Sequence, residues 1–174
     1  GEVPDDLGPD ETPADRRRIE TEESARVLGI QRVVWLGYSD SGMTGWEQND
    51  HPTSFHRADP EEAGARLASV LREESAAVLT IYDWHGNYGH PDHVAVHRAG
   101  LVAAREVPGV RVLEATMNRD AFARMIEAAR DAGVSVGSSD EEQQEFDPHG
   151  PADDGNPMGT PEAELTLAVD VSGY

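Results

Sequence analysis

The feature that most constrains the fold of this chain of 174 residues is the alternation of short apolar runs with longer segments of helical period. The apolar runs at 32–36, 77–82 and 110–115 predict buried strands. The helical periodicity predicts helices at 16–28, 60–74, 91–105 and 119–132. Strands that alternate with helices need right-handed crossovers, which make neighbouring strands parallel. We therefore predict an α/β protein with a Rossmann-like, mostly parallel sheet and helices on both of its faces.

Two segments without apolar periodicity predict loops. Residues 1–15 are acidic and rich in Pro and Gly, and residues 134–164 contain many Gly, Asp, Glu and Pro. The chain has no initiator Met, and it stops just after an apolar alternation at 165–171 that is typical of a strand. We expect residues 1–174 to form a single, incomplete domain that lacks flanking segments.

Composition excludes several classes of function. Acidic residues number 34 against 14 basic ones, so the net charge of −20 disfavours nucleic acid and anionic membrane surfaces as partners. No apolar run is long enough to span a bilayer and no signal peptide is present, which predicts a cytoplasmic protein. The absence of Cys and Lys excludes thiolate, Cys–zinc and Schiff-base chemistry. The inventory that remains suits a metal hydrolase, a glycosidase or a serine hydrolase, although no G-x-S-x-G is present.

One loop stands out as a candidate active site, the segment D-W-H-G-N-Y-G-H-P-D-H at 83–93, because it follows a predicted strand and leads into a helix. Ligands of open parallel sheets bind beyond the carboxyl ends of the strands. His90 and His93 are separated by three positions, with Asp92 between them, which suits joint metal binding or a ligand and a proton donor. The alternative is that Asp92 only complements the helix N-terminus and that both imidazoles are solvated.

The remaining histidines give weaker signals. His97 lies four positions after His93, and such a pair could chelate a metal from one helix face. No glutamate follows His93 in the H-E-x-x-H manner, so we expect that His97 packs in the core or supports a neighbouring metal ligand. We expect surface positions for the three loop histidines His51, His56 and His149. No role is assigned to His85.

Three stretches, in order along the chain, resemble the PIG-L/LmbE-like superfamily of zinc-dependent de-N-acetylases. Y-G-H-P-D-H at 88–93 is similar to the second signature of that family. R-R-I-E at 17–20 resembles its R-x-x-E helix, and G-Y-S-D-S-G-M at 37–43 resembles its D-S-G-M loop. The resemblance implies a hydrolase that removes an acetyl group from an N-acetylglucosamine-like sugar or related amide, the expected small-molecule partner.

The resemblance also implies roles for particular residues. His93 matches a zinc ligand, and His90 matches the general acid that protonates the leaving amine. Asp92 matches the electrostatic partner of that acid, and Tyr88 matches the phenol that stabilises the oxyanion.

Two further positions match residues that hold sugar hydroxyls in the glucosamine-processing members of the family. These positions are Arg17 and Asp40. Both are therefore expected to bind substrate.

One departure from the family pattern concerns the metal site. The first signature, H-P-D-D, would supply the other zinc ligands and an aspartate base, but V-P-D-D at 3–6 has no His and no preceding strand. We expect the missing signature in about 40 to 50 residues upstream, the size of a βα unit. Without it, the chain is expected to bind zinc weakly and to lack activity. The alternatives are a catalytically inactive sugar-binding relative and a metal-independent interaction protein.

Overall fold

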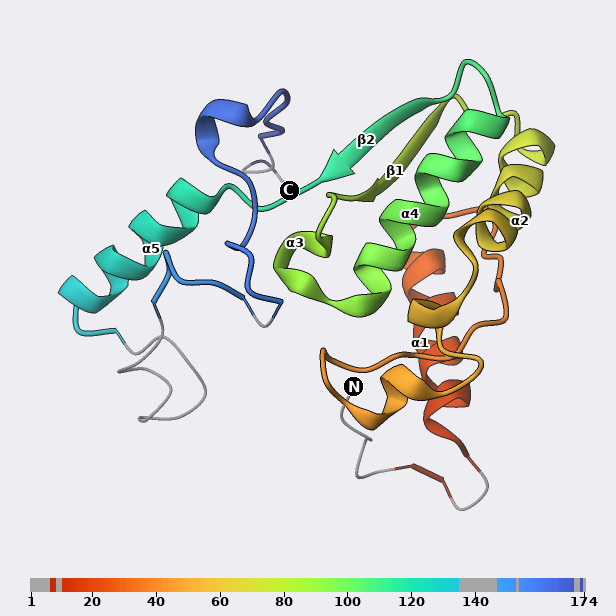
Figure 1. The fold of residues 1–174 in the computed structure, drawn as a ribbon, viewed down its shortest axis with the longest axis horizontal. Helices are drawn as coiled ribbons and strands as arrows, with labels where there is room; N and C mark the ends of the chain where they lie inside the picture. The colour runs from red at the N-terminus through yellow and green to blue at the C-terminus, as the bar shows by residue number, and fades with distance from the viewer. Residues whose placement is uncertain (1–6, 9–10, 135–146, 153, 171–172, 174) are drawn as a thin grey trace. The chain divides into compact units, whose positions relative to one another are not determined.

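The computed structural model describes residues 7–8, 11–134, 147–152, 154–170 and 173 (Figure 1). The chain divides into two compact units, Gly1–Tyr38 and Ser39–Tyr174, and each is described by itself. Whether both belong to one domain stays a prediction. The parts of the predicted loops at 1–6, 9–10, 135–146 and 153 lie outside the described residues, as do positions 171–172 of the predicted last strand.

The described part of the first unit contains one helix, α1 (Pro13–Leu28), which begins three residues before the predicted start at 16. The Thr12 hydroxyl accepts a hydrogen bond from the Asp15 backbone N–H at 3.2 Å, and the Asp15 carboxylate accepts one from the Thr12 N–H at 3.1 Å. This reciprocal capping box satisfies two backbone donors that a helix start would otherwise leave open. The predicted loop therefore ends at Thr12, and the glycine stop is confirmed because Gly29 caps the helix with φ 71°.

The predicted strand at 32–36 is wrong. These residues are irregular, and Trp35 is half exposed, with 49% of its surface accessible. An apolar run becomes a strand only where a neighbouring strand offers a hydrogen-bonding edge. Residues 32–36 do not pair with either strand of the described sheet, so their apolar character does not produce a strand.

The second unit contains a parallel pair of strands, β1 (Val78–Tyr82) and β2 (Arg111–Ala115). Val78 aligns with Arg111 and Tyr82 with Ala115, so both strands end at the same edge. The helix α4 (Pro91–Glu106) forms the crossover between them. The α/β class and the parallel sheet are confirmed, although the sheet described here has only two strands.

The core of the second unit lies between α4, the sheet and the helix α2 (Pro60–Glu73). Figure 1 shows β2, β1, α4 and α2 in succession. Close packing depends on glycine: a Cβ at Gly64 of α2 would lie 2.4 Å from Val102 Cγ1 of α4. A Cβ at Gly100 of α4 would lie 2.5 Å from Ile81 Cγ2 of β1. These contacts fix α4 against both neighbours and so fix the direction of its N-terminal end.

The remaining described elements are the short turn α3 (Gly86–Gly89), the helix α5 (Arg119–Asp131) and three short 3-10 turns at Glu47–Asp50, Phe55–Arg57 and Glu162–Glu164. The Arg119 guanidinium donates to the carbonyls of Met158 and Gly159, at 2.8 and 2.9 Å, which ties the later segment to α5. The described part of 134–164 is otherwise irregular, as predicted. None of the helices in the described ranges is long and apolar enough to cross a membrane.

The predicted strand at 165–171 is wrong over its described part, 165–170, which is irregular. Leu167 and Val169 are largely exposed. The apolar alternation has the period of a strand, but the two-stranded sheet does not incorporate it.

Candidate active site

The loop that carries the candidate site connects β1 to α4 through one short helical turn, α3 (Gly86–Gly89). Asn87 has φ 72°, a left-handed value that turns the chain sharply. Gly86 is required where it stands, because a Cβ there would lie 2.6 Å from the Cβ of His93. The turn therefore brings the loop backbone directly against the first turn of α4.

Asp83 anchors this loop at the carboxyl ends of both strands. Its buried carboxylate accepts hydrogen bonds from the Asn87 N–H at 2.7 Å and from the Thr116 hydroxyl at 2.6 Å. The Asn87 amide oxygen in turn accepts from the Met117 N–H at 3.0 Å. Sequence-distant segments thus converge on the loop, at the edge of the sheet where α/β proteins bind ligands.

His93 lies in the first turn of α4 with its ring fixed on both faces. It stacks on Tyr82, with ring centroids 3.8 Å apart, and on His90, at 4.5 Å. Its Nδ1 lies 3.2 Å from the Gly86 carbonyl oxygen, which can only accept a hydrogen bond. Nδ1 must therefore carry a proton, and in the neutral ring Nε2 has a free lone pair, the form that binds metals.

The electrostatics of His93 favour this neutral form. Burial lowers the pKa of His93 below its usual value, and the nearby His90 acts in the same direction. The Gly86 carbonyl and the carboxylates of Asp92 and Asp83 oppose the shift without cancelling it. A neutral imidazole is what a metal ligand requires.

His90 has the opposite arrangement. It is the N-cap of α4, extended at φ −62° and ψ 126° ahead of Pro91, and its Nδ1 accepts a hydrogen bond from the Asp92 N–H at 3.1 Å. A nitrogen that accepts cannot carry the proton, so in neutral His90 the proton lies on Nε2. The two stacked imidazoles thus differ at Nε2: His90 presents a donor and His93 a lone pair.

Tyr88 completes the group of rings. Its centroid lies 5.3 Å from that of His93 and 6.1 Å from that of His90, in both cases edge to face. Burial raises the pKa of the Tyr88 phenol above its ordinary value, with a smaller contribution from Tyr82. The phenol therefore stays protonated near neutral pH and can donate a hydrogen bond.

Asp92 is held by a residue that the sequence analysis did not single out. Its carboxylate accepts hydrogen bonds from the Ser41 N–H at 3.0 Å and from the Ser41 hydroxyl at 2.5 Å. The hydrogen bond between Asp92 and His90 runs through the Asp92 backbone rather than its carboxylate. Ser41 lies inside the D-S-G-M stretch, but nothing in the sequence indicates that its partner lies 51 positions away.

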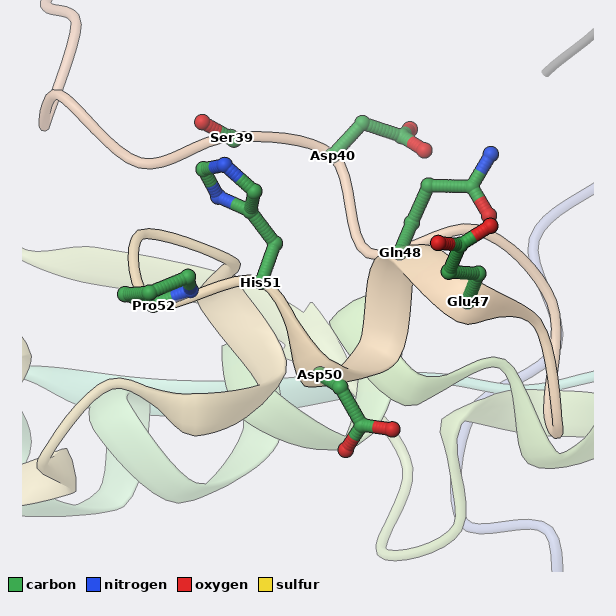
Figure 2. A pocket seen from close by; sticks show the side chains of 7 residues that line it. All are labelled: Ser39, Asp40, Glu47, Gln48, Asp50, His51 and Pro52. Atoms are coloured by element: carbon green, nitrogen blue, oxygen red, sulfur yellow. The ribbon is translucent and has the colours of Figure 1, made fainter.

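Asp40 lines an open pocket of about 620 Å³ (Figure 2). Ser39 and Asp40 come from one segment, and the other lining residues come from the turn and loop that follow it: Glu47, Gln48, Asp50, His51 and Pro52. Three of these seven residues are acidic and none is Arg. The lining therefore offers carboxylate and amide acceptors to hydroxyl groups and disfavours phosphate.

Arg17 belongs to the first unit and is described there by itself. Its guanidinium pairs with Glu20 at 2.7 Å, one helical turn along α1, and 62% of its side chain is exposed. Its predicted role in substrate binding remains a prediction.

The other histidines divide into packed and exposed positions. His97 is mostly buried, with Nδ1 3.1 Å from the Tyr82 carbonyl oxygen, which fits the packing role expected of it. His51, His56 and His149 are exposed as expected, although His51 also lines the pocket. His85 is 2% exposed, and its Nδ1 lies 3.1 Å from Asp83.

The described residues do not by themselves form a metal site. Within the described ranges no three His, Asp or Glu side chains cluster in a way that could hold a metal ion. The carboxylate nearest to His93 in sequence, that of Asp92, is engaged by Ser41. A catalytic zinc ion needs about three protein ligands, and of the described residues the family resemblance assigns only His93 to the metal.

The motifs match one family model, described as GlcNAc-PI de-N-acetylase (PIG-L), over residues 2–104. This range includes the helix α1, the D-S-G-M loop and the whole H-P-D-H motif. More than half of the chain is therefore covered.

Curated relatives give the same picture. The matching relatives are named 1D-myo-inositol 2-acetamido-2-deoxy-alpha-D-glucopyranoside deacetylase. The one from Nocardiopsis dassonvillei is 36% identical, over 99% of this chain and 64% of the relative. The one from Saccharomonospora viridis is 36% identical, over 89% of this chain and 55% of the relative. A protein of that name from Thermomonospora curvata is 47% identical over 51% of this chain and 31% of its own length. The chain thus spans less than two-thirds of the length of these relatives.

Proposed function

The chain belongs to the GlcNAc-PI de-N-acetylase (PIG-L) family, and on that basis we propose that its protein is a zinc-dependent hydrolase. The proposed reaction removes the acetyl group from an N-acetylglucosamine-type sugar and releases acetate and a free amine. The relatives are named for such a deacetylation of a glucosaminyl inositol, which supports this class of substrate.

The observation that carries the proposal is the pair of opposite ring nitrogens at the start of α4. His90 presents an N–H at Nε2, and His93 presents a lone pair there, while the two rings stack at 4.5 Å. An amine is a poor leaving group unless it is protonated, so amide hydrolysis needs a positioned acid. The arrangement supports His90 as that acid and His93 as a metal ligand, as the family resemblance implies.

The neighbouring groups suit the same reaction. The Tyr88 phenol, kept protonated by burial, can donate to the carbonyl oxygen as negative charge develops on it. We propose that the Asp92 carboxylate is the electrostatic partner of His90, the role that the family resemblance implies for it.

The pocket beside Asp40 supports a neutral, hydroxyl-rich substrate. Its acidic lining can accept hydrogen bonds from sugar hydroxyls, and it disfavours a phosphorylated sugar. We propose that Asp40 and Arg17 bind hydroxyl groups of the substrate. The small-molecule partner is therefore a polyol amide rather than an anionic lipid headgroup.

Zinc is part of the proposal through the family resemblance, and His93 would supply one ligand. The described residues do not complete the site, as the ligand count above requires. The role of this chain in the chemistry is therefore to supply one zinc ligand, His93, to donate a proton from His90 and to donate a hydrogen bond from Tyr88. The incomplete site also supports a second candidate, a sugar-binding relative without catalysis.

The test is an assay of the full-length protein with N-acetylglucosaminyl inositol, following release of the primary amine. We expect steady amine release that is lost after removal of metal with a chelator and regained with zinc. Saturable sugar binding without any amine release, in protein that retains stoichiometric zinc, would favour the sugar-binding relative and contradict the proposed reaction.

A further inference from the structure

Ser41 lies at the junction between the D-S-G-M loop and the H-P-D-H motif. It is fully buried, and its N–H and hydroxyl both donate to the carboxylate of Asp92, at 3.0 and 2.5 Å. The Ser41 hydroxyl also accepts a hydrogen bond from the His56 N–H at 2.9 Å. The His56 N–H therefore orients the Ser41 hydroxyl, which donates its own proton to the Asp92 carboxylate.

The carbonyl of Ser41 is also engaged. It accepts a hydrogen bond from the Asn49 side-chain amide, which donates as well to the Met43 carbonyl at 3.0 Å. Asn49 belongs to the 3-10 turn that forms part of the pocket wall. Ser41 thus connects the wall of the pocket, where its neighbour Asp40 lies, to the first turn of α4.

Asp92 is the point through which this connection reaches the imidazoles. Its backbone N–H donates to Nδ1 of His90, the bond that places the His90 proton on Nε2. The Asp92 carboxylate lies on this same first turn of α4, so the two hydrogen bonds from Ser41 hold the turn, and the cap that His90 forms on it, against the D-S-G-M loop. The orientation of the acid therefore depends on what holds Asp92.

We propose that Ser41 is a positioning residue that clamps Asp92 and thereby fixes the tautomer and orientation of His90 relative to the pocket. This inference rests on the proposed function, because it assigns Ser41 to the same reaction. Serine suits the position: alanine keeps the N–H bond but loses the hydroxyl bond, and a larger side chain has no free surface to occupy.

The first test is a double-mutant cycle on the full-length enzyme, with Ser41→Ala, Asp92→Ala and the double variant. We expect Ser41→Ala to lower kcat by about tenfold with KM changed by less than about twofold. The kcat of the double variant should lie within about twofold of the kcat of Asp92→Ala, because the two residues act as one unit. Effects on kcat that multiply, or an unchanged kcat in Ser41→Ala, would overturn the proposal.

The matched control is Ser54→Ala, which removes another buried serine hydroxyl from the same region. The Ser54 hydroxyl donates to the Asn49 carbonyl at 3.2 Å and does not contact Asp92. We expect its kcat to stay within about twofold of wild type even if its stability falls as far as that of Ser41→Ala.

A second readout does not depend on activity. Long-range proton–nitrogen NMR spectra of the imidazoles should show the proton of neutral His90 on Nε2 in wild type and in Ser54→Ala, and a tautomer mixture in Ser41→Ala. An unchanged His90 tautomer in Ser41→Ala would overturn the clamp. If the wild-type protein released no amine from the sugar, the proposed function would fail, while the tautomer spectra would still decide the role of Ser41.

Discussion

The helices α1 and α4 both have 16 residues and both begin with a proline, yet they are held in place by different interactions. α1 has one buried residue, Ala25, and several of its charged side chains pair within the helix, as Arg17 does with Glu20. α4 buries five residues along its length: Pro91, Ala99, Gly100, Val102 and Ala103. Local sequence is enough to begin and end either helix, and α4 is fixed in addition by its packing against α2 and β1.

The difference determines what can be inferred about function. The hydrogen-bond partners of His90 and His93 assign a proton to a specific nitrogen of each ring, because α4 and its preceding loop fix both rings. The exposed guanidinium of Arg17 pairs with Glu20 on its own helix, and an exposed pair of this kind is weak. Its role therefore rests on the family pattern rather than on geometry.

The packing of α4 against α2 can be disrupted at Gly64. Gly64→Ala places a Cβ 2.4 Å from Val102 Cγ1, and relieving that clash should move α2 and α4 apart. We expect the free energy of unfolding, measured by urea denaturation, to fall by about 1 to 3 kcal/mol, as for other overpacked cores. Ser69→Ala on the exposed face of α2 is the control and should change it by less than about 0.5 kcal/mol. Equal stability of both variants would show that the packing does not fix α4.

A smaller effect separates the two interpretations of Arg17. If Arg17 holds a sugar hydroxyl, Arg17→Ala should reduce kcat/KM for a glucosaminide by the equivalent of about 1 to 3 kcal/mol, with little change in stability. Arg26→Ala is the matched control, because Arg26 forms an equally exposed pair with Glu23 on the same helix. Equal kinetics of the two variants would leave Arg17 as a surface ion pair only.

The elements that the sequence predicted well are those with both a periodic pattern and a start signal. α2 and α4 begin at Pro60 and Pro91 as predicted, and the parallel pair β1 and β2 follows from the helix between them. The predicted strands at 32–36 and 165–170 failed because an apolar run does not specify a partner strand. Strand formation depends on a neighbouring edge, which a single segment cannot supply.

The same limit applies to the candidate site. The H-P-D-H motif located His90, Asp92 and His93, because their spacing is local. Ser41 was not predicted, since its contact with Asp92 is made between segments far apart in the chain. Which ring nitrogen carries the proton in His90 and in His93 also depends on hydrogen-bond partners that only the fold reveals.

The different roles proposed for His90 and His93 can be separated by measuring metal content together with kcat. In the full-length enzyme, His90→Ala should lower kcat by about a hundredfold or more while about one zinc per chain is retained. His93→Ala should lose the zinc and the activity together. Loss of zinc in His90→Ala, or full zinc content in His93→Ala, would contradict the division of roles that the two ring nitrogens indicate.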